Sequence, residues 1–364
     1  MKPHILIIGT GAIADHHLHG IRRTFGDSGC TISATDANPA ALEAFGRKAG
    51  EAVRLYPSVE AMLAQPAGQN DVVIVATPPF THHALAIQAL RSGRHVLCEK
   101  PLATSVGQAD EMFATARELG LVLMDCSVRF LDWPANRHVR ELVNDGKLGR
   151  LNQLRWQHRQ NRVRFGIEAQ PQTTWALDRS KNGGGCLMDW GPYDFSILNE
   201  VFQPEKVEVA HAWMESPETR LSLPAGVVFD VEEAVGASLR LTRKDGSSFS
   251  VVFERSACTH GEEFSVAAIE GSAGAVRWDW LMFEPEARVW HSRDEDGKLV
   301  TATETFQNDP TLLTWVEKPI RWIFDRIAGK PCPAPSADEL LFNFRCLRSL
   351  YDAASSGTSK TVTK

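Results

Sequence analysis

The sequence lacks several features that would assign a protein to a class at once. No two cysteines have the C-x-x-C spacing that is typical of zinc or redox sites, and the seven cysteines are odd in number and scattered. No apolar run approaches the roughly 18 residues of a membrane-spanning helix, and the N-terminal segment does not have the pattern of a secretory signal. We therefore expect free thiols and a cytoplasmic protein.

An excess of positive charge is also missing, and tryptophan is absent from part of the chain. The formal net charge of -6 offers no basic field, so nucleic acid and membrane surfaces are not expected as partners. All ten tryptophans lie between Trp133 and Trp322, and the first 132 residues contain none. With a length of 364 residues, this uneven distribution predicts two domains that do different work.

The first part of the chain follows a βαβ rhythm. Short apolar segments at 4–9, 31–35, 72–77 and 95–100 alternate with longer amphipathic ones. The segment VVIVA is apolar throughout, which is typical of strands covered by helices on both faces of a parallel sheet. Residues 1–126 are therefore predicted to form an α/β domain with a doubly wound parallel sheet.

From residue 127 onward the pattern changes. A linking helix is expected at 134–144, and longer segments then alternate polar and apolar residues, which favours an antiparallel sheet with one exposed face. These segments are 151–160, 206–213, 232–242, 248–256, 263–271 and 275–280. Helical spacing returns at 338–354. Residues 127–364 are predicted to form an α+β domain with a large, open, mainly antiparallel sheet.

A glycine-rich turn follows the first predicted strand. Residues 9–14 read G-x-G-x-x-A, the spacing at which a helix N-terminus approaches the pyrophosphate of a dinucleotide in a Rossmann domain. The next strand is expected to end at Asp36, whose carboxylate can bind the adenosine ribose and repel a 2'-phosphate. NAD is the expected cofactor, with NADP as the alternative. The predicted cofactor contacts here are Gly9, Thr10, Gly11, Ala12, Ile13 and Asp36.

Three further motifs follow in order: ATPP at 76–79, CEKPLA at 98–103 and GGGCLMDWGPY at 183–193. Together with the glycine loop, they resemble the Gfo/Idh/MocA family of glucose-fructose oxidoreductase, inositol dehydrogenase and rhizopine catabolism proteins. The resemblance covers nearly the whole chain, through GKLG at 146–149 and RIAGKPCP at 326–333. It implies an NAD(P)-dependent oxidoreductase that acts on a hydroxyl or carbonyl of a sugar, polyol or similar small polar substrate. It also implies a homodimer or homotetramer, associated through the second-domain sheet.

The resemblance also implies roles for individual residues. Lys100 matches the family's catalytic lysine, and Pro101 matches a position that commonly follows a cis peptide bond. Asp189 matches the first position of the family's D-x-G-x-H pattern, whose last position is Tyr193 here, as in the glucose-fructose oxidoreductase branch. The remaining implied cofactor contacts are Thr77, Pro78, His82, Glu99 and Lys100, and the implied substrate contacts are Lys100, Trp175, Asp189 and Tyr193.

The chemistry requires a group that takes the hydroxyl proton as the hydride leaves the carbon, and a lysine with a lowered pKa can do this. Tyr193 could donate a hydrogen bond, relay the proton or only position the substrate. Asp189 and Tyr193 share one helix face if that segment is helical, but the helix could instead begin at Pro192.

No metal is expected. His16, His17 and His19 cluster in the first predicted helix, but their side chains should diverge. Two other functions stay open: a glycosidase that uses NAD to oxidise and re-reduce its substrate, and a sensor that keeps the dinucleotide site without catalysis.

Overall fold

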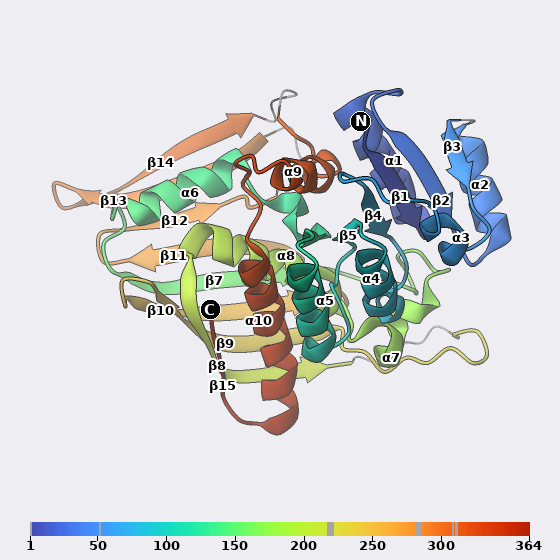
Figure 1. Cartoon of the computed structure of the whole chain (residues 1–364). Helices are drawn as coiled ribbons and strands as arrows, with labels where there is room; N and C mark the ends of the chain where they lie inside the picture. Colours follow the sequence, from blue (N-terminus) through green and yellow to red (C-terminus); the bar gives the residue numbers. More distant parts are fainter. Residues whose placement is uncertain (1, 51, 217–221, 282–285, 308, 310–311) are drawn as a thin grey trace. The chain divides into compact units, whose positions relative to one another are not determined.

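The computed structural model describes residues 2–50, 52–216, 222–281, 286–307, 309 and 312–364 (Figure 1). The chain divides into two compact units, which are described separately below. The first comprises Met1–Arg129 and Leu313–Leu341, and the second comprises Phe130–Leu312 and Phe342–Lys364.

The described part of the first unit is built on a six-stranded parallel sheet with the order β3-β2-β1-β4-β5-β6. This is the strand order of the Rossmann fold, so the predicted doubly wound sheet is confirmed. The strands are β1 (His4–Ile8), β2 (Thr31–Thr35), β3 (Val53–Leu55), β4 (Val72–Val75), β5 (His95–Cys98) and β6 (Leu123–Asp125). The helices between them are α1 (Ala12–Phe25), α2 (Pro39–Ala49), α3 (Val59–Leu63), α4 (His82–Arg91) and α5 (Val106–Glu118), and the short 3-10 segments are η1 (Pro79–Thr81) and η2 (Cys126–Phe130).

The central strands of this sheet are buried along their length. Every residue of β4 and β5 is buried, and β1 is buried from Ile5 onward, because helices cover both faces of a doubly wound sheet. The parallel strands all end at the same edge, where ligands bind in this class of sheet. The glycine loop, the ATPP turn and the EKP turn each follow one of these strands.

The described part of the second unit contains a nine-stranded sheet with the order β14-β13-β12-β11-β7-β10-β9-β8-β15. Its strands are antiparallel except for the central pair β7 and β10, which run parallel. The strands are β7 (Leu151–Arg159), β8 (Pro204–Glu215), β9 (Ala234–Arg243), β10 (Ser248–Ser256), β11 (Phe264–Gly271), β12 (Gly274–Trp278), β13 (Glu286–Glu295), β14 (Lys298–Gln307) and β15 (Lys360–Thr363). The mainly antiparallel sheet is therefore confirmed, with a parallel pair at its centre.

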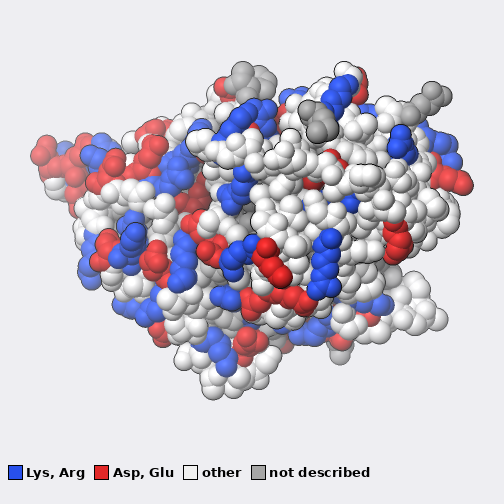
Figure 2. All heavy atoms as spheres, in the orientation of Figure 1, with Lys and Arg blue, Asp and Glu red and all other residues white. Residues whose placement is uncertain are grey.

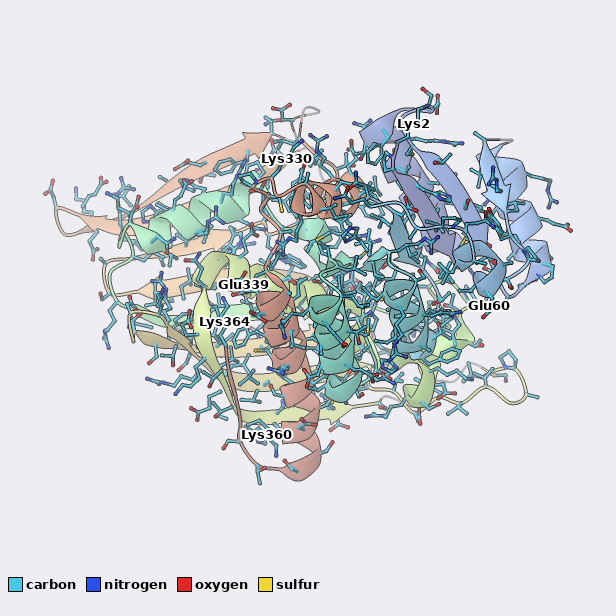
Figure 3. All side chains as sticks on the ribbon, viewed as in Figure 1. Lys2, Glu60, Lys330, Glu339, Lys360 and Lys364 are labelled. Carbon is cyan, nitrogen blue, oxygen red and sulfur yellow. The ribbon has the colours of Figure 1, made fainter. Side chains whose placement is uncertain are left out.

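One face of this sheet carries helices, and the residues of its strands alternate accordingly. In β10, Phe249, Val251 and Phe253 are buried, whereas Ser250 and Val252 are exposed. The helices of this unit are α6 (Pro134–Asn144), α7 (Arg179–Asn182), α8 (Cys186–Phe202) and the larger part of α10 (Ala337–Ser356), with the 3-10 segment η3 (Thr174–Leu177) before α7. Helix α8 packs on β9 and β10, and α6 packs on α8, β12 and β13. Figure 3 labels Lys360 and Lys364 at the C-terminal strand β15.

The segment 313–341 belongs to the first unit, although the expected boundary at 126/127 placed it in the second domain. Its helix α9 (Glu317–Ile327) packs on α1. A Cβ added at Gly20 would lie only 2.3 Å from the main-chain oxygen of Val316, so the two segments meet backbone to backbone. Phe25 also packs edge-on against Phe324, with ring centroids 4.9 Å apart. These contacts join positions about 300 residues apart, which no local sequence pattern reveals.

Among the described residues, no helix combines the length and apolar character needed to cross a membrane. On the face drawn in Figure 2, Lys and Arg side chains are interspersed with Asp and Glu. This mixed surface agrees with the net charge of -6 and offers no continuous basic area on that face.

Candidate functional site

The glycine loop has the geometry that a dinucleotide requires. Gly9 adopts a φ of +95°, and a Cβ there would lie 2.6 Å from the main-chain oxygen of Ala76 on the neighbouring strand end. A Cβ at Gly11 would instead point into open space, so the backbone at this position can be approached closely. Gly11 is the N-cap of α1 and provides no side-chain cap, which leaves N–H groups of the first turn for an anion. Ala14, the third small position, is fully buried.

Asp36 directly follows β2 and binds the glycine loop. Its Oδ2 accepts hydrogen bonds from the main-chain N of Thr10 at 2.6 Å and from the Thr10 hydroxyl at 3.0 Å. Its Oδ1 accepts a bond from the main-chain N of Asn38 at 2.7 Å. The carboxylate therefore lies at the loop end where the sequence places the adenosine ribose, and it also fixes the conformation of that loop.

Lys100 lies at the carboxyl end of β5, in a turn with a cis peptide bond to Pro101, as expected. The main-chain N of Glu99 bonds to the carbonyl of Val75 at 2.9 Å, which ties this turn to the end of β4. The main-chain N of Lys100 donates to the Glu99 carboxylate at 3.1 Å. Lys100 is half-buried, whereas Glu99 is buried.

The Glu99 carboxylate is held by a histidine and an arginine from other elements. His17 of α1 lies 2.6 Å from Oε1, and Arg129 of η2 contacts both carboxylate oxygens, with Nη1 2.8 Å from Oε2. Burial favours a higher pKa for Glu99, but the Arg129 charge and the hydrogen bonds from Arg129 and His17 hold that pKa well below its usual range. Burial lowers the pKa of His17 despite its bond to Glu99, so the neutral ring donates through Nε2–H.

Sequence reasoning did not place His17 at this site, and it identified Arg129 only as a basic residue after the sixth strand. His17 was considered within the histidine cluster 16–19, whose side chains diverge as expected: His17 is buried, while His16 and His19 are exposed. The partner that assigns both residues to the site, Glu99, is 82 residues from His17 and 30 from Arg129. The only available signal was the presence of ionisable residues at positions that helix and strand periodicity would bury.

His17 and Glu99 also form, with Cys126, a buried group whose possible ligand atoms lie within 4.8 Å of one another. The Arg129 guanidinium already pairs with the carboxylate of this group, and its positive charge opposes a cation there. Burial also raises the pKa of the Cys126 thiol well above its usual range, which keeps the thiol protonated. We therefore assign no metal site to these three residues.

The ATPP turn is linked to the EKP turn by a buried histidine. His82 has no exposed surface, and its Nε2 lies 2.7 Å from the carbonyl of Thr77 while its Nδ1 lies 2.9 Å from the carbonyl of Pro101. The ring therefore faces protein atoms on both sides, and its predicted contact with the cofactor stays a prediction. Thr77 and Pro78 are half-buried at the end of β4, next to the glycine loop.

In the second unit, Asp189 and Tyr193 both belong to α8, at positions one helical turn apart. The alternative in which a helix begins at Pro192 is wrong, because α8 starts at Cys186 and Pro192 lies inside it. A proline within a helix costs about 3 kcal/mol or more. Nearly all residues of α8 are buried, and that packing offsets the cost. Asp189 lies in the first turn, where a carboxylate interacts favourably with the helix dipole.

Tyr193 is buried in an aromatic cluster of this unit. Its ring packs edge-on against Phe130, with centroids 4.6 Å apart, and lies 5.7 Å from the ring of Trp190. Trp190 in turn lies under the guanidinium of Arg255, which pairs with Asp194 on the next turn of α8. Trp175 lies apart from these printed contacts, half-buried in η3, and its predicted stacking on a sugar stays a prediction.

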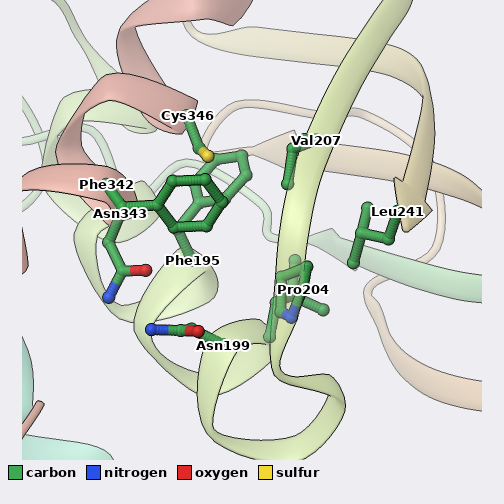
Figure 4. A pocket seen from close by; sticks show the side chains of 9 residues that line it. Phe195, Asn199, Pro204, Val207, Leu241, Phe342, Asn343 and Cys346 are labelled. Atoms are coloured by element: carbon green, nitrogen blue, oxygen red, sulfur yellow. The ribbon is translucent and has the colours of Figure 1, made fainter. Parts of the chain in front are cut away.

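A small cavity in the same unit lies between α8, α10 and the sheet (Figure 4). Its volume is about 10 Å³, about the space of a single water molecule, and its lining is mainly apolar. Phe195 and Asn199 of α8, Phe342 and Cys346 of α10, and Val207 of β8 line it. This space cannot take a sugar, so we do not consider it as a substrate site.

Comparison with known protein families confirms the resemblance inferred from the motifs. Residues 4–126 match the model of an oxidoreductase family with an NAD-binding Rossmann fold, and residues 136–277 match the GFO/IDH/MocA C-terminal domain. The chain belongs to the Gfo/Idh/MocA family. Its first unit therefore contains the NAD-binding Rossmann domain of that family, as the open glycine loop and Asp36 require.

Two curated relatives carry names of sugar reductases. The chain is 31% identical over 203 residues to 1,5-anhydro-D-fructose reductase from Ensifer adhaerens, which is 56% of this chain and 57% of the relative. It is 32% identical over 246 residues to dTDP-3,4-didehydro-2,6-dideoxy-alpha-D-glucose 3-reductase from Actinomadura kijaniata, which is 67% of this chain and 64% of the relative. The matched parts span less than two thirds of either relative.

Among solved structures, the chain is similar to levoglucosan dehydrogenase in complex with NADH and levoglucosan. The TM-score is 0.78 at 19% identity, and the match covers 100% of both chains. At this identity the similarity concerns the fold, and it extends the Gfo/Idh/MocA architecture over both units.

Proposed function

We propose that this member of the Gfo/Idh/MocA family is an NAD(P)-dependent oxidoreductase that transfers a hydride between nicotinamide and a CH–OH or carbonyl group. The proposed substrate is a sugar, polyol or related small polar molecule. The relatives named for anhydrofructose, a nucleotide-linked deoxyglucose and levoglucosan support this class of substrate.

The observation that carries the proposal is the position of Lys100. It follows a parallel strand at the edge where the glycine loop also lies, and its main chain is bonded to a carboxylate that His17 and Arg129 hold. In the direction of alcohol oxidation, the Lys100 amine takes the hydroxyl proton as the C–H hydride departs, and the substrate carbon becomes a carbonyl. The bound nicotinamide supplies the hydride acceptor. In reduction, the Lys100 ammonium returns the proton to the oxygen.

Asp189 and Tyr193 have proposed roles in the same reaction. Their spacing of one helical turn allows both to contact one substrate, with Asp189 accepting hydrogen bonds from hydroxyls. Tyr193 is proposed to donate a hydrogen bond to the reacting oxygen or to relay its proton. We further propose that the functional division follows the expected ranges, with cofactor binding in 1–126 and substrate binding and assembly into a dimer or tetramer in 127–364.

A spectrophotometric panel tests this function. Levoglucosan, 1,5-anhydro-D-fructose and myo-inositol are supplied with NAD, NADP, NADH and NADPH, and absorbance of the reduced cofactor is followed. We expect stoichiometric formation or consumption of the reduced cofactor with at least one of these substrates. Release of p-nitrophenol from p-nitrophenyl glycosides without net cofactor turnover would instead identify an NAD-dependent glycosidase. Cofactor binding without either reaction would identify a sensor.

A further inference from the structure

The start of α8 is capped by a residue far away in the sequence. Its N-cap, Gly185, has no side chain to accept the hydrogen bonds of the first turn. The Glu232 carboxylate takes that place: its Oε1 accepts from the main-chain N of Gly185 at 2.8 Å and of Leu187 at 3.1 Å. The main-chain carbonyl of Glu232 accepts from the main-chain N of Cys186 at 3.1 Å. Three successive N–H groups are thus bound by one residue.

Helix α10 fixes this cap from its other side. The Tyr351 hydroxyl donates to the same Oε1 of Glu232 at 2.7 Å, and both side chains are buried. Burial, together with the adjacent Glu232, raises the pKa of Tyr351 well above its usual range, so the hydroxyl remains a donor. Arg348, one turn earlier, lies over the Tyr351 ring and donates to the carbonyl of Gly183 at 3.0 Å.

The three consecutive glycines before α8 are explained by this contact. Gly183 adopts a φ of +80° as the C-cap of α7. A Cβ at Gly184 would lie 2.0 Å from the Tyr351 hydroxyl, and a Cβ at Gly185 would lie 1.9 Å from the carbonyl oxygen of Glu232. The chain therefore passes between Tyr351 and Glu232 with no room for side chains.

The capped donors lie directly before Asp189. The main-chain N of Asp189 donates to the carbonyl of Gly185 at 3.0 Å, so the position of Asp189 is set within one turn of the cap. Tyr193 follows on the next turn. We propose that Glu232 and Tyr351 are positioning residues for the reaction, which set the placement of Asp189 and Tyr193 by fixing the start of α8. This inference rests on the function proposed above for Asp189 and Tyr193.

The test compares variants at the cap with a neighbouring buried glutamate. Glu232→Ala removes the acceptor, Glu232→Gln keeps one acceptor oxygen, and Tyr351→Phe removes one donor. Glu233→Ala is the matched control, because Glu233 is also buried and adjacent but makes no printed contact with α8. The turnover number is measured with the panel substrate that the unmodified enzyme converts fastest, and it is divided by the folded fraction. The dissociation constant for NADH is measured in parallel by fluorescence.

We expect Glu232→Ala to lower kcat about 10- to 100-fold, since a displacement near 1 Å costs rates of this order. Tyr351→Phe should lower kcat by a smaller factor, and Glu232→Gln should restore it to within about threefold of the unmodified enzyme. The NADH dissociation constant and the kcat of Glu233→Ala should not change. A residue that only stabilises the fold would lower the melting temperature without lowering kcat per folded molecule, and that result in Glu232→Ala and Tyr351→Phe would overturn the proposal.

A double variant separates this proposal from the function proposed for Asp189. If Glu232 acts through Asp189, adding Glu232→Ala to Asp189→Ala should cause little further loss of kcat. A full, additive loss would overturn the positioning role while leaving the role of Asp189 intact. Unchanged kcat in Asp189→Ala alone would refute the proposed role of Asp189 itself. If Glu232→Ala does not fold, the same comparison is made with Tyr351→Phe.

Discussion

At the scale of single residues, the chain places each proposed reacting group beside a partner that constrains it. Asp36 is bonded to Thr10 of the glycine loop, and the main chain at Lys100 is bonded to Glu99. Glu99 is in turn fixed by His17 and Arg129, so its carboxylate stays ionised and immobile. The turn that carries Lys100 is thus held in place before a substrate binds, which reduces the reorganisation that the reaction would otherwise require.

The role proposed for Lys100 predicts different behaviour for two substitutions. Lys100→Ala removes the amine, and Lys100→Arg keeps a positive charge that cannot be deprotonated. Because an acid/base group must lose its proton, both variants should lower kcat about 10²- to 10⁴-fold. The NADH dissociation constant should stay within about threefold, since the proposed partner of Lys100 is the substrate. Full activity in Lys100→Arg would show that the charge alone is needed, and full activity in Lys100→Ala would refute the mechanism.

At the scale of elements, the sequence pattern predicted those whose burial is strong and local. The strands of the first sheet were identified from continuous apolar runs such as 72–76, and the strands β7 and β10 from their alternation. The hairpin β13–β14 was not predicted, because β14 has few buried residues and its alternation is weak. The parallel pairing of β7 with β10 joins strands about 100 residues apart, so only the folded chain shows it.

Helix α9 was not predicted either, and it gives a test at this scale. Gly20→Ala would place a methyl group 2.3 Å from the main-chain oxygen of Val316, which cannot move as a flexible side chain would. We expect a loss of about 1–3 kcal/mol in the free energy of unfolding and faster hydrogen exchange in 313–329. Gly107→Ala in α5 is the control, because nothing lies within 4 Å of its Cβ. It should be neutral or stabilising by up to about 1 kcal/mol. Equal effects of the two substitutions, measured by urea unfolding, would refute the contact.

At the scale of the whole molecule, buried charge makes stability depend on pH. Glu233 is only 3% exposed, and burial raises its pKa to about 8, although the nearby Arg164 opposes this rise. Between the carboxyl's usual pKa of 4.5 and about 8, the folded protein keeps a proton that the unfolded chain releases. This group's contribution therefore makes the folded state less stable as pH rises through that window, by up to about 1.4 kcal/mol per pH unit.

Glu233→Gln should remove this dependence. The free energy of unfolding, measured in urea at pH 5, 6, 7 and 8, should fall less steeply with pH in the variant than in the unmodified protein. Glu43→Gln, at an exposed position of α2, should leave the slope unchanged. An unaltered slope in Glu233→Gln would show that this carboxyl is not the source.

The return of 313–341 to the first unit has a consequence for the order in which the protein is made. A ribosome delivers residues 1–129 first, but the backbone that packs against Gly20 emerges only after the 183 residues of 130–312. At about 5–20 residues per second, that interval lasts roughly 10 to 40 s. During it, the nascent nucleotide-binding sheet leaves the α1 surface around Gly20 uncovered. The first unit to be translated is therefore completed late, after the strands of the second sheet from β7 to β14 have left the ribosome.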